Sequence, residues 1–254
     1  AGLIQHADES APILGVDGTG APISVDLDAD SPHVLISAGT GGGKSVTVRS
    51  IAAQMLANGA IATVLDIKRH SHRWAKNLPN VGYASTLPEI GNALVELGRE
   101  VHRRNEIVEN WPGTIETAPV GPRIVVMFEE LNATMSQLRE LTKRIPSGTY
   151  DATDALSDVL FLGRAAKVHV IGVMQFPDFR VLSQAMVEQF NTRIMIRYTK
   201  NAWVKIAWDA GLPQAAPSEA GRGMVVYGGK ARETQLMFLT EEEAAQLARS
   251  PYAP

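Results

Sequence analysis

The sequence lacks cysteine, long apolar runs and any excess of basic charge. The absence of cysteine excludes disulfide bonds, thiolate metal sites and cysteine nucleophiles. No apolar run approaches the roughly 18 residues that a membrane-spanning helix needs. The formal net charge of −3 argues against a chain coated with basic residues. Any nucleic acid would therefore be bound locally, through a patch or a ring of loops.

The remaining composition is that of an ordinary globular protein. Hydrophobic residues make up 45% of the 254 residues and charged residues 20%. This length fits one large α/β domain, or a main domain with a small attachment. The chain begins at Ala1 without a charged-then-apolar signal region. We expect an excised, cytoplasmic domain, with any membrane anchor outside this chain.

A glycine-rich segment is the most informative feature of the sequence. It reads Ala-Gly-Thr-Gly-Gly-Gly-Lys-Ser over residues 38–45, between an apolar run at 34–36 and a helical pattern at 46–56. Strand, glycine-rich turn, Lys-Ser and helix in this order are typical of a phosphate-binding P-loop. Ala38 replaces the usual first glycine, which is a mild change. The alternative, a flexible linker that contains Lys-Ser by chance, does not account for the strand and the helix.

The P-loop pattern predicts contacts with a nucleoside triphosphate. Glycines let successive backbone N–H groups point at phosphate oxygens, and the helix N-terminus adds partial positive charge. Lys44 would reach the β- and γ-phosphates, and the Ser45 hydroxyl would complete the shell of a Mg²⁺ ion. The expected cofactors are ATP and Mg²⁺, with nucleotide contacts from Gly39, Thr40, Gly41, Gly42, Gly43, Lys44, Ser45 and Val46.

Short apolar runs alternate with helical patterns along most of the chain. Strands are predicted at residues 61–65, 124–128, 168–174 and 192–198. Helices are predicted at about residues 45–57, 88–107, 136–143, 154–162 and 202–208, with a last one after the capping box at Thr240. Hairpins are predicted at residues 13–27 and 224–238.

These elements predict an α/β fold with a mostly parallel sheet flanked by helices, and with small antiparallel hairpins near both ends. We expect residues 1–30 to form an N-terminal segment with a β-hairpin, packed on a core of residues 31–254.

Two acidic residues, Glu129 and Glu130, directly follow the apolar strand at 124–128. Phosphate hydrolysis needs one carboxylate to hold the Mg²⁺ shell and another to polarise the attacking water, both at the C-terminal edge of a buried strand. We assign the metal role to Glu129, where Asp is commoner, and the role of catalytic base to Glu130. The alternative is that both are first-turn acids of the next helix, where they favour the dipole. Since Asp is the commoner residue, we expect Glu129→Asp to be tolerated.

Gln175 ends the strand at 168–174, where its side chain could touch the γ-phosphate or the attacking water. Other polar and aromatic residues are interpreted as structural. His70 and His72 are expected to be solvated loop histidines, because no third ligand for a metal is near in sequence. The cluster of Arg99, Arg103 and Arg104 is expected to be one solvated helix face.

In combination, these segments resemble the FtsK/SpoIIIE-type DNA-pumping ATPases. The similarity starts at Leu14-Gly15, includes the P-loop, and continues through Asp66-Ile67-Lys68 and the strand that ends in Glu129-Glu130. It extends to residues 162–169, 173–177 and 191–196, so it spans about residues 13–245 in the order of the family. Ala38, Glu129 and Phe176 depart from the family pattern. The short form is most similar to the conjugative, TraB-like motors that transfer double-stranded DNA.

The resemblance implies a RecA-like ATPase core that assembles into a homo-oligomeric ring of six subunits. Double-stranded DNA would pass through the central pore, driven by ATP hydrolysis. The arginine that acts on a neighbouring subunit's ATP in the family would correspond to Arg193. The DNA-facing loops would carry Arg139, Lys143, Arg144 and Arg180.

Two other functions remain open at this point. The first is an ATPase that moves polypeptide, as in the related type-VII secretion systems, and stimulation by DNA would distinguish it from a DNA motor. The second is a nucleotide-regulated assembly module in which the Glu129 site barely hydrolyses ATP.

Overall fold

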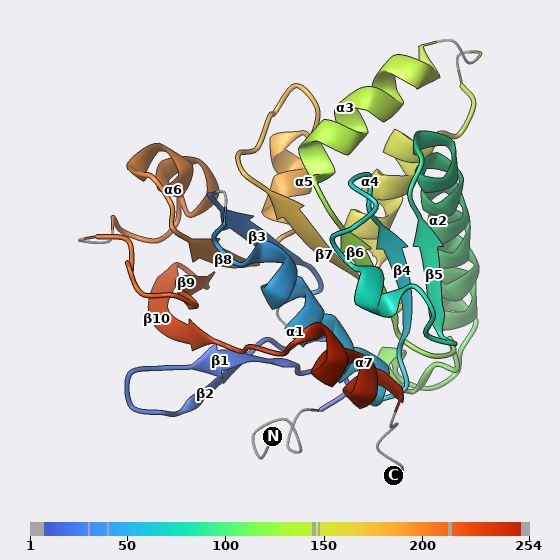
Figure 1. The fold of residues 1–254 in the computed structure, drawn as a ribbon. Helices are drawn as coiled ribbons and strands as arrows, with labels where there is room; N and C mark the ends of the chain where they lie inside the picture. The colour runs from blue at the N-terminus through green and yellow to red at the C-terminus, as the bar shows by residue number, and fades with distance from the viewer. Residues whose placement is uncertain are drawn as a thin grey trace.

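The computed structural model describes residues 8–29, 31–39, 41–143, 146, 148–212 and 215–249. Its centre is a ten-stranded sheet in the order β2-β1-β10-β9-β8-β3-β7-β6-β4-β5 (Figure 1). The strands are β1 Ile13–Val16, β2 Pro22–Ser24, β3 Val34–Ala38, β4 Ile61–Leu65, β5 Val81–Ala84, β6 Ile124–Phe128, β7 Val168–Met174, β8 Thr192–Ile196, β9 Arg222–Tyr227 and β10 Lys230–Leu236.

Six strands, from β8 to β5 in sheet order, are parallel, and the other four extend the sheet in antiparallel fashion. β9 and β10 form the C-terminal hairpin, and β10 pairs with β1 of the N-terminal hairpin. The predicted fold class, a mostly parallel sheet with antiparallel hairpins near both ends, is confirmed. The division into residues 1–30 and 31–254 stays a prediction.

Helices cover both faces of the sheet (Figure 1). They are α1 Lys44–Ala57, α2 Leu87–Glu109, α3 Leu131–Thr142, α4 Ala152–Leu162, α5 Gln184–Glu188, α6 Lys200–Ile206 and α7 Glu241–Arg249, with short 3-10 helices η2 Arg73–Ala75 and η3 Ile115–Thr117. On one face α1 packs against α7, and on the other α2 packs against α4. Each face has its own cluster of buried apolar side chains.

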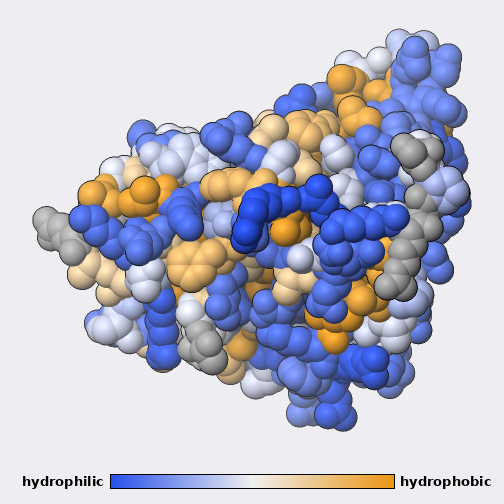
Figure 2. All heavy atoms as spheres, turned by 90° about the horizontal axis from the view of Figure 1, so that it is seen from above, coloured by the Kyte–Doolittle hydropathy of each residue, from blue (hydrophilic) through white to orange (hydrophobic). Residues whose placement is uncertain are grey.

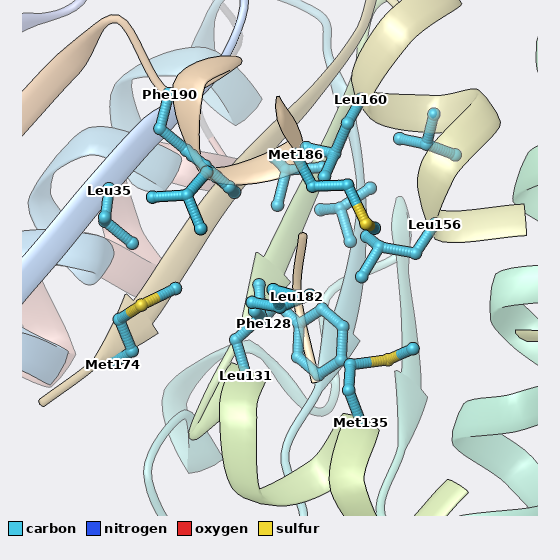
Figure 3. Close-up of a cluster of buried hydrophobic side chains, with 14 of the residues drawn as sticks. Leu35, Phe128, Leu131, Met135, Leu156, Leu160, Met174, Leu182, Met186 and Phe190 are labelled. Atoms are coloured by element: carbon cyan, nitrogen blue, oxygen red, sulfur yellow. The ribbon is translucent and has the colours of Figure 1, made fainter. Parts of the chain in front are cut away.

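The cluster beneath α3 and α4 is drawn in Figure 3. Phe128 of β6 and Met174 of β7 contribute to it from the sheet, and Leu131, Met135, Leu156 and Leu160 from the helices. Burying one side chain of this size contributes about 1.5–3 kcal/mol. Because β6 and β7 bury both faces, their ends are held rigidly, and so are the residues that directly follow them.

Helix boundaries follow from capping residues in the sequence. α2 begins with a capping box in which Thr86 and Glu89 bind each other's backbone N–H groups. Asp151 and Asp154 do the same for α4. Thr240 and Glu243 form the predicted box at the start of α7, with bonds of 2.7 and 3.1 Å.

Candidate nucleotide-binding site

The loop between β3 and α1 has the conformation that its glycines predict. Gly41 and Gly43 have positive φ angles of 71° and 91°, which L side chains rarely adopt. A Cβ on Gly42 would lie 2.8 Å from the Cβ of Ala38, so this position also requires glycine. Thr40, one of the expected nucleotide contacts, lies outside the described residues. The loop leads into α1 at Gly43, which has no side chain to occupy the first N–H groups of the helix.

Lys44 and Ser45 are the first two residues of α1. The Lys44 ammonium folds back over the loop and donates to the carbonyl oxygens of Ala38, at 2.9 Å, and Gly39, at 3.4 Å. Burial lowers the pKa of Lys44, and the nearby Glu130 opposes this effect. The Ser45 hydroxyl donates to Glu129 Oε1 at 3.0 Å. The P-loop and the acidic pair, far apart in sequence, are therefore in direct contact.

The two carboxylates differ sharply in environment. Glu129 is 1% exposed, and its Oε2 atom finds no hydrogen-bond partner within the described parts of the chain. Burial alone would raise the pKa of Glu129. The contacts with His72 and Ser45 and the charge of Lys68 outweigh burial and lower this pKa, so the carboxylate is charged. Glu130 is the residue before α3 and has a left-handed backbone with φ 50°. Its Oε1 atom lies 2.5 Å from Lys68 Nζ.

A buried carboxylate oxygen without a partner fits a Mg²⁺ ion, since Mg²⁺ uses one or two protein oxygens and keeps several waters. The Ser45 hydroxyl, in the first turn of α1, and the Glu129 carboxylate, directly after β6, offer oxygens beside the P-loop. Because parallel strands end at the same edge, Gln175 lies there too. Its carbonyl accepts a hydrogen bond of 3.0 Å from Ser37 of β3, and its side chain is exposed.

Arg193 is buried and has partners within its own chain. It is 3% exposed and lies near the start of β8, opposite Leu35 of β3, whereas the P-loop follows the other end of β3. Its guanidinium donates to Asp209 at 2.6 Å and to the Ile206 carbonyl at 3.0 Å, and it stacks over Trp208. Its Nε is buried and has no hydrogen-bond partner among the described residues. The role of Arg193 at a neighbouring subunit's ATP stays a prediction.

Sequence reasoning missed three residues near the P-loop. His72 was expected in solvent but is fully buried, with Nε2 2.9 Å from Glu129 Oε1. Lys68 contacts Glu130, and its place just after Asp66 at the end of β4 could have indicated this. Arg197 follows β8 with φ 47° and lines a cavity of about 380 Å³ beside the P-loop, together with Val46, Thr47, Met237 and Phe238.

The basic residues assigned to DNA-facing loops are already occupied. Lys143 pairs with Glu140 at 2.5 Å, and Arg180 pairs with Asp178 at 3.0 Å. Arg139 donates to the backbone carbonyls of Arg180 and Val181. Arg144 lies outside the described residues.

Seen from above, most of the molecule's surface is hydrophilic, with apolar patches between the hydrophilic side chains (Figure 2).

One arginine of the cluster that was interpreted as a solvated face is buried. Arg104 is 2% exposed and binds Glu100 and the carbonyls of Pro122 and Ala166. Arg99 and Arg103 are solvent-exposed, as expected. Arg104 therefore connects α2 to the starts of β6 and β7 and is structural.

The fold and this site define a P-loop ATPase, with a glycine-rich phosphate loop beside a carboxylate at the end of a parallel strand. Residues 13–76 match the family model described as the central domain of the helicase HerA. DNA translocase FtsK of Staphylococcus epidermidis is 24% identical over 91% of this chain, and that of Halalkalibacterium halodurans is 25% identical over 91%. The chain spans 30% and 31% of their respective lengths.

Two solved structures share the fold. The conjugation coupling protein TcpA of pCW3, solved with ATPγS, has a TM-score of 0.74 at 22% identity, over 94% of this chain and 70% of that one. The cytoplasmic domain of the type VII secretion ATPase EccC of Thermomonospora curvata has a TM-score of 0.74 at 17% identity. The match covers 97% of this chain and 32% of that one. These comparisons support an ATPase of the FtsK/SpoIIIE type. None of the helices in the described ranges has the length and apolar character needed to span a bilayer.

Proposed function

We propose that this chain is the motor domain of a DNA translocase, which hydrolyses ATP to move double-stranded DNA through a ring of six copies. The contact of Ser45 with Glu129 carries the proposal, because it joins the phosphate loop to the carboxylate that a hydrolysing site requires. The likeness to FtsK and to a conjugation coupling protein supports DNA as the substrate.

In the proposed site, the backbone of Gly39, Gly41, Gly42 and Gly43 surrounds the phosphates, together with Thr40 and Val46. Lys44 leaves its two carbonyl partners to bind the β- and γ-phosphates. Ser45 and Glu129 would hold Mg²⁺, and the ion would neutralise charge on the phosphate oxygens. The apolar cavity beside Val46 and Phe238 has room for the nucleoside.

Glu130 is the proposed base that orients and deprotonates the attacking water, with Gln175 at the same sheet edge. Its carboxylate contacts Lys68, so catalysis requires this ion pair to open or to be shared when nucleotide binds. Burial alone would lower the pKa of Lys68, but the hydrogen bond to Glu130 raises it, so the lysine is charged. The γ-phosphate would compete with Glu130 for that charge.

An ATPase that moves polypeptide is the second candidate. EccC matches the fold as well as TcpA does, and the loop after β7 exposes two aromatic side chains, Phe176 at 44% and Phe179 at 46%. Arg180, a basic residue of the same loop, forms an ion pair with Asp178, which neutralises its charge. Exposed aromatic side chains are better suited to contact an extended polypeptide than to contact the phosphate backbone of DNA.

The deciding experiment is the ATPase rate with and without duplex DNA of mixed sequence. We expect DNA to raise the rate, and salt to remove the stimulation steeply because phosphate contacts dominate. Lys44→Ala should abolish nucleotide binding or turnover, whereas Glu130→Gln should bind ATP and lose most hydrolysis.

A wild-type rate that is unchanged by DNA but raised by unfolded polypeptide would favour the second candidate. Full hydrolysis by Lys44→Ala would contradict the assigned phosphate site itself.

A further inference from the structure

His72 is a buried histidine next to the proposed metal carboxylate, in a segment where the sequence predicts only a loop. Its side chain and that of Glu129 are 0% and 1% exposed, and His72 Nε2 lies 2.9 Å from Glu129 Oε1. The ring N–H is not aligned for a full hydrogen bond: neither ring nitrogen of His72 has an aligned partner among the residues described.

The backbone around His72 is fixed by Asp66, the residue that follows β4. The Asp66 carboxylate accepts hydrogen bonds from the backbone N–H groups of Lys68 and Ser71, at 3.1 and 2.8 Å, and from the Tyr83 hydroxyl at 2.6 Å. The His72 carbonyl accepts from Ala75 N at 3.0 Å as η2 begins. The backbone that carries the imidazole is thus fixed at the sheet edge, and the ring itself is fully buried.

Glu129 needs such support more than an aspartate would. A glutamate has one more rotatable bond, so its carboxylate loses more freedom when it is fixed. Both Ser45 and His72 contact the same oxygen, Oε1, and Oε2 stays buried with no partner in the described part of the chain. Partners of this kind orient a metal's ligands, and their loss typically costs 10–100-fold in metal affinity or activity.

We infer that His72 is a positioning residue that holds the Glu129 carboxylate so that Oε2 faces the metal of the Mg²⁺–nucleotide complex. The inference rests on the proposed function, since it assumes that Ser45 and Glu129 bind Mg²⁺ with ATP. His72 itself contacts neither the nucleotide nor the metal. Its effect should therefore appear in the Mg²⁺ requirement and not in binding of metal-free nucleotide.

The test is the binding of a fluorescent ATP analogue to the whole chain, titrated at a series of Mg²⁺ concentrations and in EDTA. His72→Ala should raise the Mg²⁺ concentration for half-maximal effect about tenfold or more, and leave the affinity in EDTA unchanged. His72→Gln, whose amide can still donate to Glu129, should lie closer to wild type. His70→Ala is the matched control, because His70 is exposed two residues away, and it should bind as wild type does.

The double variant Glu129→Gln/His72→Ala distinguishes a loss of positioning from a general loosening of the site. If His72 acts through Glu129, adding His72→Ala to Glu129→Gln should change the Mg²⁺ requirement no further. An unchanged Mg²⁺ requirement in His72→Gln and in folded His72→Ala would overturn the inference, and so would an equal loss in the Glu129→Gln background. If His72→Ala does not fold, His72→Leu takes its place, because leucine fills the buried space and cannot donate to Glu129, and a wild-type Mg²⁺ requirement in that variant decides against the inference. A wild-type chain that binds nucleotide without any Mg²⁺ effect would refute the proposed metal site itself.

Discussion

Three segments of the chain meet at the carboxylate of Glu129. Ser45 approaches from α1, His72 from the segment after β4, and Glu129 itself extends from β6. Its contacts of 3.0 and 2.9 Å are set by the length of a glutamate side chain. The same length determines which substitution the site can accept.

The sequence predicts that Glu129→Asp is tolerated, because Asp is the commoner residue at this position. The geometry of the site predicts instead that this substitution damages it. Shortening the side chain by one carbon–carbon bond withdraws the carboxylate by about 1.5 Å. Neither Ser45 nor His72 would then remain within hydrogen-bond distance. We expect an ATPase rate on the order of tenfold lower and a raised Mg²⁺ requirement, measured by steady-state kinetics at varied Mg²⁺. A variant with wild-type rate and Mg²⁺ dependence would show that these contacts do not matter.

Sequence reasoning found the residues of this site whose roles depend on local order and missed those that depend on folding of a loop. Lys44 and Ser45 are recognisable because strand, glycines and helix are contiguous. His72 lies in a stretch without clear periodicity, and only the turn around Asp66 buries it. The pairing of Arg193 with Asp209 was not foreseen, because Asp209 lies beyond α6 and has no pattern that identifies it.

At the scale of elements, the strands buried on both faces were predictable, and β5, one of the two edge strands, was not. β4, β6 and β7 have the expected bounds because continuous apolar runs have few alternatives. β5, at the edge of the sheet, contains Gly82 and is largely half-exposed, so it has neither the apolar run nor the alternation that indicate a strand. The short α5 was missed for a similar reason, since one turn shows no period.

The N-terminal hairpin depends on a close approach of two backbones at Gly15. A Cβ at this position would lie 2.2 Å from the carbonyl oxygen of Gln235 in β10. We expect Gly15→Ala to push β1 away from β10 and to lower the free energy of unfolding by about 1–3 kcal/mol in urea denaturation. Gly18→Ala, in the open turn of the same hairpin, has no atom within 4 Å of the added Cβ and is the control. Equal stability of the two variants would mean that this pairing is not formed in solution.

At the scale of the whole molecule, two buried histidines tie stability to pH. His33 contacts the Leu160 carbonyl and the Val170 N–H through its two ring nitrogens. Burial lowers the pKa of His33 to about 4. Burial, followed by the charge of Arg123, lowers the pKa of His169 to about 3. Both imidazoles are therefore neutral in the folded chain at neutral pH.

The unfolded chain binds protons at these histidines below a pH of about 6.5, and the folded chain does not. Stability should be fully present above this pH and fall as pH decreases toward 4. The expected loss is up to about 1.4 kcal/mol per pH unit for each histidine. Urea denaturation between pH 7.5 and 5 measures it. A free energy of unfolding that stays constant over this range would show that the histidines are protonated in the fold.

The pairing of β1 with β10 has a consequence for how the chain is made. Gly15 and Leu236 are partners in the sheet, although about 220 residues separate them. On the ribosome, the first strand is synthesised long before its partner, and closing so large a loop costs entropy that only the finished contacts repay. Until β10 emerges, one edge of β1 and the apolar side chains beneath it, such as Leu14, lie open to solvent and to other chains. The nascent domain is thus most prone to aggregation in the interval after β1 has been synthesised and before β10 has emerged.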